Sequence, residues 1–520
     1  MAAVARASER LALRLLAAAD ALANRLYSQP LNPLYQSGTI VVALYLVLVV
    51  TGLWLTLFYR IGAPWESVSR VTADPWAGNW VRGLHRYASD LAVVATAVHA
   101  LRMFAQGRSW GPRTLAWVSG CILLLLLFVC GWTGYVMVWD TFGQHLAREG
   151  ARMIDTLPVL SEPTARAFTG EQPPPRVFFF LNLFAHIAIP LAMGVVFWLH
   201  LKRLARPGLL PPRTLLWVVT GALAAGAIVW PVEMAPRADP FVLPAEMPAD
   251  PFFAFWVPVG RRLSAGGALL LAVVAGVALL VVPWVMKPPR ARVPLPSVVD
   301  EDLCVGCVQC SIDCPYGAIT MVERTSRRSD LVARVDPGLC VSCGICAGSC
   351  SPMGVGPPGR TGRDQMASVR EFLASPDRRP GEVVVACCDH GAGRAEARAA
   401  GAAIFPVDCA GNLHTSIVEL LIRSGAGGVL IVACPPRDCV HREGPRWLHE
   451  RLYHGREAEL QARVDRARVR VAHASAGERG VAMAAIRAFT ADVARLGRSV
   501  ERDDADVETG CEPKLAAGRR

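Results

Sequence analysis

Hydrophobic residues form long stretches in the first 290 residues of the chain and short ones after them. Residues 38–59 and 115–139 contain no charged residue, and each stretch is long enough to cross a bilayer core, which needs about 20 residues. Four weaker stretches follow the same pattern, at residues 84–104, 177–200, 214–231 and 263–286. The pattern therefore predicts a membrane domain over residues 1–290, an α-helical bundle with six transmembrane helices.

Charged residues indicate how these helices are oriented. Arg6, Arg10 and Arg14 interrupt the apolar positions near the N-terminus, so we expect an amphipathic surface helix there and not a secretory signal. Basic residues gather in the loops after the second, fourth and sixth spans: Arg102, Arg108, Arg113, Lys202, Arg203, Arg206, Arg213, Lys287, Arg290 and Arg292. Because such loops stay inside, the pattern predicts both chain ends in the cytoplasm, in the cytoplasmic membrane of a bacterium or archaeon.

The composition adds to this picture. Of the 520 residues, 53% are hydrophobic and 19% are charged, and the net charge is +11. A basic excess can indicate nucleic-acid binding, but the basic loops account for it here, so we expect membrane lipid and not nucleic acid as a partner. The sequence has no obvious nucleophile–base pattern, phosphate loop or dinucleotide fingerprint.

Two predicted spans each carry two histidines that are fourteen residues apart: His85 and His99, and His186 and His200. Fourteen helical residues rise about 21 Å and end about 40° short of four turns, so each pair lies on one helix face at two membrane depths. Since the two spans run in the same direction, His85 lies level with His186 and His99 with His200. Paired imidazoles at two levels predict two six-coordinate haems, although a single intramembrane histidine can also be a polar contact between helices.

Glycines on the first and third spans have the same spacing of fourteen residues: Gly38 and Gly52, and Gly120 and Gly134. A missing side chain lets the backbone approach a flat macrocycle closely. The sequences Arg82-Gly-Leu-His85 and Gly134-Tyr135-Val136, and Pro190 four residues after His186, complete the pattern. Over about residues 25–205 the chain thus resembles cytochrome b of the quinol-oxidising respiratory and photosynthetic complexes.

This resemblance implies a di-haem four-helix core in which the four histidines bind two b-type haems and Arg82 lies near a haem propionate. It also implies a quinone partner and a homodimer. The quinol motif of the family, Pro-Glu-Trp-Tyr, does not occur in LPAEMPADPFFAFWVP at residues 243–258. Glu233, Glu246 and Asp250 are candidate proton acceptors there, and an ordinary surface loop is the alternative.

Two cysteine runs follow a linker rich in proline and arginine at residues 287–296. In the bacterial two-cluster pattern, the fourth cysteine of each run ligates the other cluster. One [4Fe–4S] cluster then uses the cluster-one cysteines Cys304, Cys307, Cys310 and Cys350, and the other uses the cluster-two cysteines Cys340, Cys343, Cys346 and Cys314. Zinc needs no third cysteine at this spacing, and a cytoplasmic location disfavours disulfides. Residues 291–356 resemble two-[4Fe–4S] ferredoxins, an α+β fold.

Short β-rich runs alternate with helical ones from residue 381 to residue 500, which predicts a small α/β domain with a parallel sheet. Runs at residues 383–388, 403–409 and 428–434 each end in cysteine. Since the carboxyl ends of parallel strands meet at one edge, we expect five thiols there: Cys387, Cys388, Cys409, Cys434 and Cys439. They can hold a metal cluster, and a thiol–disulfide centre or buried inert cysteines are the alternatives.

Residues 409–444, CAGNLHTSIVELLIRSGAGGVLIVACPPRDCVHREG, are similar to the delta, iron–sulfur subunit of methyl-viologen-reducing hydrogenases. The resemblance implies a [2Fe–2S] cluster and electron exchange with heterodisulfide-reductase-type flavoproteins. Gly391 replaces one cysteine of the family's early motif, so four of the five thiols would bind. We expect the nearby histidines to be solvated: His390, His414 and His441. Cys121 and Cys130 should pack as small apolar residues. Residues 357–380 should form a linker, and Cys511 should lie in a charged tail, 501–520, without a site.

These features predict a multidomain electron-transfer subunit, an oxidoreductase component that is not a complete enzyme alone. It would link the quinone pool to a cytoplasmic flavoprotein, heterodisulfide-reductase-like or hydrogenase-like partner. A membrane anchor and electron relay without its own quinone site is one alternative. A C-terminal thiol–disulfide redox module is another.

Overall fold

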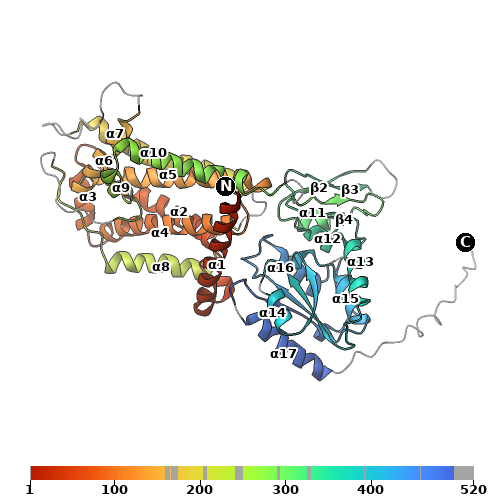
Figure 1. Cartoon of the computed structure of the whole chain (residues 1–520). Helices are drawn as coiled ribbons and strands as arrows, with labels where there is room; N and C mark the ends of the chain where they lie inside the picture. The colour runs from red at the N-terminus through yellow and green to blue at the C-terminus, as the bar shows by residue number, and fades with distance from the viewer. Residues whose placement is uncertain are drawn as a thin grey trace, which may run out of the picture. The chain divides into compact units, whose positions relative to one another are not determined.

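The computed structural model describes residues 2–157, 164, 174–202, 208–239, 250–289, 293–324, 330–391, 393–456, 458–478 and 480–496. The chain forms two compact units, which we call the membrane unit, Met1–Val293, and the cysteine-rich unit, Pro294–Arg520. In Figure 1 the first is helical and the second contains both helices and strands.

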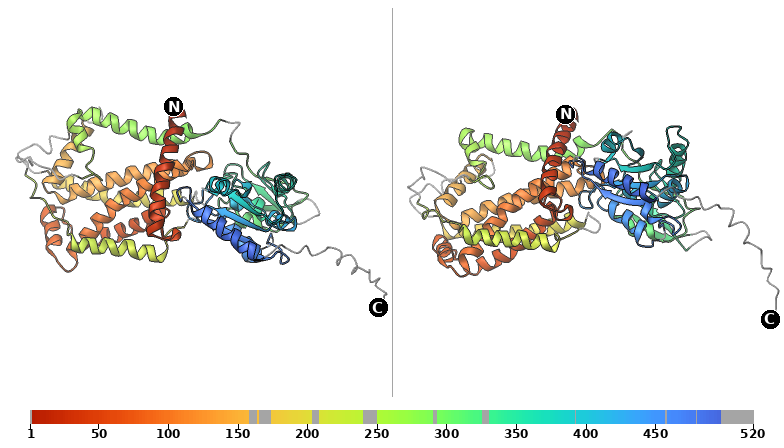
Figure 2. Two further views of the ribbon diagram at one scale, coloured as in Figure 1. Left: turned by 60° about the horizontal axis from the view of Figure 1, so that its bottom comes forward. Right: turned by 90° about the horizontal axis from the view of Figure 1, so that it is seen from below.

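Long helices make up the described part of the membrane unit. They are α1 (Ala2–Leu26), α2 (Ser37–Thr56), α3 (Pro64–Ala73), α4 (Gly78–Ala105), α5 (Thr114–Val138), α6 (Thr141–Ile154), α7 (Arg176–Lys202), α8 (Arg213–Val229), α9 (Val257–Arg262) and α10 (Ala265–Met286), with short 3₁₀ turns η1 (Gln29–Leu31) and η2 (Gly111–Arg113). Helix α2 packs on α4 and α5 packs on α7, and the four run side by side in Figures 1 and 2. Apolar side chains from all four helices form one core between them.

Five helices of the described residues are long and apolar enough to cross a membrane: α2, α4, α5 with the turn before it, α7 and α10. The chain is therefore a multi-pass membrane protein by the length and composition of these helices. The fifth predicted span, residues 214–231, forms the shorter helix α8, which has 17 residues. It ends at Val229 because Pro231 follows, and the residue before a proline is disfavoured in helical geometry. The prediction of six full spans is corrected to five and one shorter apolar helix.

Helix α1 is anchored on α4 by a buried ion pair. The Arg102 guanidinium at the end of α4 donates to the Asp20 carboxylate on α1, and the two side chains are 5% and 6% exposed. The same guanidinium lies 4.9 Å from the centre of the Tyr35 ring. Ala12 and Leu16 of α1 pack beside this pair on Ala105. The ion pair therefore lies in an apolar contact, where removing one of the two charges leaves the other buried without a partner.

The first part of the cysteine-rich unit consists of two similar halves. Strand β1 (Val298–Val299) pairs with β4 (Val355–Gly356), and β2 (Ile319–Glu323) pairs with β3 (Leu331–Val335), both antiparallel. Short helices α11 (Gln309–Asp313) and α12 (Ile345–Ser349) each follow a cysteine-containing loop. This arrangement is the α+β fold that the cysteine spacing predicted.

A four-stranded parallel sheet forms the second part of this unit, with the order β6-β5-β7-β8. The strands are β5 (Val383–Cys388), β6 (Ala403–Val407), β7 (Gly428–Ala433) and β8 (Val469–His473). Helices α14 (Gly393–Ala399) and α17 (Val481–Leu496) pack on one face, and α13 (Gly362–Leu373), α15 (Thr415–Arg423) and α16 (Gly444–Tyr453) on the other. Figure 2 shows α17 against the sheet. The predicted parallel sheet is confirmed, with β8 as an additional strand.

Residues 357–380, which we expected to be a linker, contain helix α13. A capping box between Thr361 and Asp364 begins the helix, because each side chain accepts from the other residue's backbone N–H. Val369 is fully buried in the core under the sheet. This segment therefore joins the two parts of the cysteine-rich unit by packing and does not separate them.

We expect Arg102→Gln to loosen α1. The change removes the guanidinium from the buried Asp20 carboxylate, which costs about 3–5 kcal/mol, so the amide hydrogens of α1 should exchange faster. Hydrogen exchange read by mass spectrometry on the protein in nanodiscs measures this. The double variant Arg102→Leu with Asp20→Leu removes both charges and should keep α1 protected. Unchanged exchange in Arg102→Gln contradicts the anchoring role.

Candidate metal centres

The four intramembrane histidines form the two predicted pairs. The ring centres of His85 and His186 are 6.5 Å apart. His186 is the strongest electrostatic neighbour of His85, and His200 is that of His99. In a bis-histidine haem, each metal–imidazole bond is about 2 Å long. Two such bonds and the radii of the two rings add up to a distance between ring centres that is similar to the one between His85 and His186. The geometry of the pair therefore fits one iron between two imidazoles.

Each of the four predicted glycines lies against one histidine ring. A Cβ added at Gly38 would lie 2.9 Å from the ring of His99, and one at Gly134 would lie 3.0 Å from His186. The same distance is 3.3 Å from Gly52 to His85 and 3.6 Å from Gly120 to His200. The glycines therefore leave room for the imidazoles that the sequence places at the same two levels.

A hydroxyl residue precedes each glycine, a feature that our sequence analysis missed. Three of these hydroxyls contact the Nδ1 of a predicted haem ligand: Thr51 with His85 at 2.8 Å, Thr133 with His186 at 3.0 Å, and Ser119 with His200 at 2.9 Å. Ser37 holds the fourth position, before Gly38, and is buried. The repeated Ser/Thr-Gly pair is a sequence signal that could have identified them.

Backbone carbonyls fix the imidazole tautomer. The His186 Nδ1 lies 3.0 Å from the carbonyl oxygen of Cys130, which can only accept, so Nδ1 carries the hydrogen. His85 and His200 make the equivalent backbone hydrogen bonds to Leu48 and Ala116. The Nε2 lone pair of each ring is then available to a metal, as is usual for metal-bound histidine. The residues present therefore fit a bis-histidine haem.

Arg82 and Cys130 lie beside the His85–His186 pair. The Arg82 guanidinium donates to the Val232 carbonyl at 2.7 Å, so it connects α4 to the segment after α8. The Cys130 thiol is 3.7 Å from the Nδ1 of His186 and 4.0 Å from its carbonyl oxygen. That carbonyl lacks its usual helical donor because Pro190, four residues later, has no N–H. Cys130 is therefore a polar neighbour of a candidate ligand and more than a packing residue.

A buried polar network lies at the same end of the membrane unit. The Asp250 carboxylate accepts hydrogen bonds from the Tyr135 hydroxyl and, at 3.0 Å, from the Arg86 guanidinium, which also pairs with Asp90. The Asp250 side chain is 6% exposed. Of the other two candidate acids, Glu233 is exposed, and Glu246 lies outside the described residues. Of the three candidate acids, only Asp250 is therefore seen among the described residues in contact with Arg86, the residue that follows His85.

The four cluster-one cysteines line one cavity between the two halves of the α+β part, with Val299 and Ala333 beside them. Its empty volume is about 340 Å³, including its opening to solvent. Burial, and then the charges of the cluster-two residue Cys346 and of the other three cluster-one cysteines, raise the pKa of Cys310. Four thiolates this close require a positive group between them, which an iron–sulfur cluster supplies.

The cluster-two cysteines are also one another's neighbours. Burial, and then the charges of Cys346, Cys314 and Cys340, raise the pKa of Cys343. Polar hydrogens point at sulfur in both groups: Gly354 N–H donates to Cys350 at 3.2 Å and Ala318 N–H to Cys314 at 3.3 Å. Such hydrogen bonds stabilise thiolates and tune cluster potentials.

Four of the five C-terminal thiols form a group. The sulfur of Cys388 lies 3.7 Å from that of Cys434, and it also hydrogen-bonds with the Cys409 thiol, which in turn contacts Cys439. Hydrogen bonds from Cys409 and Cys434 lower the pKa of Cys388. Cys387 is the residue before Cys388 in β5 and therefore points to the other face of the sheet, into the core under α14 and α17.

The prediction for the nearby histidines is wrong in one case. His414 is 2% exposed, and its Nδ1 accepts from the Ser416 N–H while its Nε2 donates to the Cys350 carbonyl at 3.1 Å. It therefore connects the first turn of α15 to the end of the second cysteine run. His390 is exposed and His441 half-buried, and Cys511 lies outside the described residues.

Among the described residues, no three histidine, cysteine or carboxylate side chains are grouped closely enough to hold a single metal ion. The four cysteines of a [4Fe–4S] cluster each bind a different iron, so they are spaced more widely than the ligands of one ion.

Comparison with known families agrees with the three kinds of site. Residues 22–208 match the family model for cytochrome b/b6/petB, residues 303–354 that for a 4Fe-4S dicluster domain, and residues 383–497 that for the delta subunit of methyl-viologen-reducing hydrogenase. The chain is thus a multidomain membrane protein with domains of electron-transfer families. It joins a cytochrome b domain, a ferredoxin-type domain and a hydrogenase delta-subunit domain, which confirms the resemblances in the sequence.

One solved structure that matches is described as "Hyperthermophilic respiratory Complex III". It is 16% identical, with a TM-score of 0.38, over 48% of this chain and 75% of the other.

We expect Gly38→Ala to reduce binding of the haem between His99 and His200, because the new methyl would lie 2.9 Å from the His99 ring. Gly120→Ala is the matched control on the same pair, since its methyl would make an ordinary contact at 3.6 Å. Haem content and the low-spin optical spectrum of purified protein measure the difference. Equal haem content in both variants contradicts this account of the glycines.

Cys388→Ala should abolish the C-terminal cluster, and Cys387→Ala should leave it in place, because the two thiols face opposite sides of the sheet. Iron and acid-labile sulfide per chain, together with the EPR spectrum of the reduced protein, distinguish the two. Loss of the same signal in Cys387→Ala shows that the assignment of the four thiols is wrong.

Proposed function

We propose that this protein is the electron-transfer subunit of an oxidoreductase. It carries electrons between the membrane quinone pool and a cytoplasmic flavoprotein, heterodisulfide-reductase-like or hydrogenase-like partner, with both chain ends in the cytoplasm. The observation that carries the proposal is the combination of paired intramembrane histidines with three groups of cysteines in one chain. When bound, two b-type haems, two [4Fe–4S] clusters and one [2Fe–2S] cluster supply reversible one-electron chemistry.

The histidine pairs would hold the two haems at two depths of the bilayer. His85 and His186 are the ligands of the outer site, and His99 and His200 those of the inner site. Hydrogen bonds at Nδ1 keep three of the rings in the orientation that presents Nε2. Two levels let an electron cross part of the membrane, and a full crossing is worth about 2.3 kcal/mol per 100 mV.

The cysteine groups would hold the clusters of the cytoplasmic part. The cluster-one and cluster-two cysteines each come from both runs, which ties the two halves of the α+β part together. Cys388, Cys409, Cys434 and Cys439 are the proposed ligands of the [2Fe–2S] cluster. Four thiols in mutual contact favour a cluster over a thiol–disulfide centre, which uses two.

Asp250 is the proposed proton acceptor of a quinone site next to the outer haem. Oxidation of a quinol releases two electrons and two protons. One proton would pass to the Asp250 carboxylate and the other to solvent, and a haem held by His85 and His186 would supply the one-electron acceptor. The Tyr135 hydroxyl and the Arg86 guanidinium hold the Asp250 carboxylate in place. Because Arg86 also pairs with Asp90, its positive charge is shared between the two carboxylates. Reduction of a quinone uses the same groups in reverse.

A relay without its own quinone site is the second candidate function. The missing Pro-Glu-Trp-Tyr motif at residues 243–258 favours it. In that case the haems pass electrons to a separate quinone-binding subunit, or to a second copy of the chain in a homodimer of the cytochrome b type.

We expect Asp250→Asn to slow reduction of the haems by a quinol analogue roughly 100-fold, the usual contribution of a general base, with unchanged haem spectra. Stopped-flow spectroscopy of the reconstituted protein measures the rate. Glu233→Gln changes an exposed acid of the same region and should reduce at the normal rate. If quinol and quinone analogues neither reduce nor oxidise the haems of the unchanged protein, the relay without a quinone site is correct.

A further inference from the structure

Two cysteine-bearing segments pack closely inside the cysteine-rich unit. Helix α12 carries the cluster-two residue Cys346, and the 3₁₀ turn η5 (Ala410–Asn412) follows Cys409 of the C-terminal group. A Cβ added at Gly348 would lie 2.7 Å from the Gly411 carbonyl oxygen, so the two backbones are in contact. The cluster-two ligands are therefore next to those of the C-terminal cluster.

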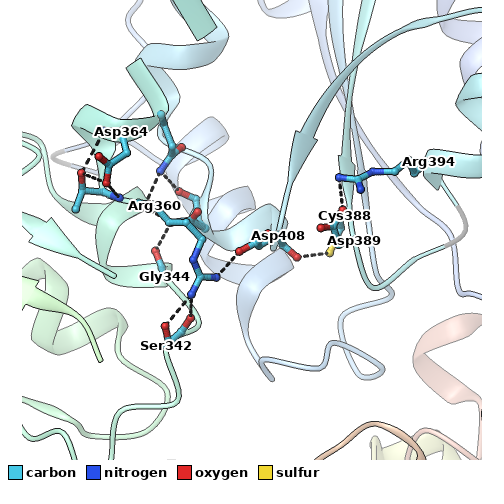
Figure 3. A network of polar contacts seen from close by, with 11 residues as sticks. Ser342, Gly344, Arg360, Asp364, Cys388, Asp389, Arg394 and Asp408 are labelled. Carbon is cyan, nitrogen blue, oxygen red and sulfur yellow. Dashed lines mark hydrogen bonds and ion pairs between the residues drawn. The ribbon is translucent and has the colours of Figure 1, made fainter. Parts of the chain in front are cut away.

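Arg360 connects the loop before α12 to the residue before Cys409, as Figure 3 shows. Its guanidinium donates to the Ser342 carbonyl at 2.8 Å and to the Asp408 carboxylate at 2.5 Å. Ser342 lies between two cluster-two ligands, and Asp408 precedes Cys409. The side chain of Arg360 is 25% exposed, so solvent screens its charge in part.

Arg451 reaches this contact from α16 and is buried within it. It is 1% exposed, and it donates to the Ser349 hydroxyl at 2.9 Å and to the Gly411 carbonyl at 2.7 Å. Its Nε–H is buried and has no hydrogen-bond partner among the described residues. Burial lowers the pKa of Arg451 to about 10, so the guanidinium remains charged at neutral pH.

Among the described residues, no carboxylate forms an ion pair with Arg451. Asp313 is the acid that acts most strongly on it, but Asp313 is shared with Arg456, whose guanidinium lies 2.6 Å from it. The three side chains together therefore carry one net positive charge, and a buried charge without a partner is unfavourable. The sulfurs of Cys346 and Cys409, one from each group, also act on Arg451, and they would be thiolates when these cysteines bind clusters.

We propose that Arg451 raises the reduction potentials of two clusters at once, the one bound by the cluster-two cysteines and the C-terminal one. Each added electron places a negative charge near the guanidinium, which stabilises the reduced form. This inference rests on the proposed function, because both groups of thiols must hold clusters.

The test is an EPR-monitored redox titration of the full-length protein. In the neutral variants Arg451→Gln and Arg451→Met, both midpoint potentials should fall by at least a tenfold change in the one-electron equilibrium, about 59 mV. Arg451→Lys keeps the charge and should keep both potentials. Arg446→Gln removes the same charge from the same helix at a side chain that is 56% exposed, and should shift neither.

Three results overturn the inference: both potentials unchanged with full iron content, a shift of only one signal, or a shift in Arg451→Lys as large as in Arg451→Gln.

Arg451 can be replaced without exposing Asp313, which keeps its contacts with Arg456 and the Ser349 hydroxyl. If neither neutral variant keeps its iron, Arg451→Lys decides, since a lysine lacks the guanidinium fork. Unchanged potentials then support the role of the charge, and shifted ones refute it. Missing iron–sulfur signals in the unchanged protein contradict the proposed function itself.

Discussion

Close backbone approach at glycines is the constraint on which the candidate centres of both units depend. In the membrane unit, Gly38 and Gly134 leave room for imidazole rings that even a methyl group would crowd. In the cysteine-rich unit, a Cβ at Gly444 would lie 2.8 Å from the Cys409 sulfur. A side chain at these positions would push the metal-binding groups apart, because packed interiors relax only in part. The polar contacts that orient these groups, such as Nδ1 to carbonyl, therefore exist only because the glycines do.

Much of the membrane unit could be predicted because its signals are periodic. Residues fourteen apart must share a helix face, so the pairing of His85 with His186 and of His99 with His200 follows from two spans that run in parallel. The hydroxyls at Thr51, Ser119 and Thr133 could not be assigned in this way. Serine and threonine usually bond their own helix, and these acquire a second partner only when the neighbouring helix places an imidazole there.

The cysteine-rich unit shows where sequence reasoning ends. Strand alternation separates Cys387 from Cys388, but which face holds Cys409, Cys434 and Cys439 depends on helices far apart in the sequence. His414 was expected to be solvated, yet it is buried between α15 and the second cysteine run. The Thr361–Asp364 capping box was a readable helix signal inside a segment that we expected to be a linker.

The two halves of the α+β part repeat at 36 residues, and one difference between them places a hydroxyl beside a cluster-two cysteine. Asp300 N–H to Gly354 O and Asp336 N–H to Ala318 O are both 2.7 Å, so the backbones are equivalent. Ser297, whose hydroxyl is 3.3 Å from the Cys346 sulfur, corresponds to Ala333, whose methyl lines the cluster-one cavity. A hydroxyl donor stabilises a reduced cluster and a methyl does not. Arg451 acts in the same direction on the same side. On the proposed function, an electron at the cluster-one site would therefore move downhill to the cluster-two site, which adjoins the C-terminal thiols.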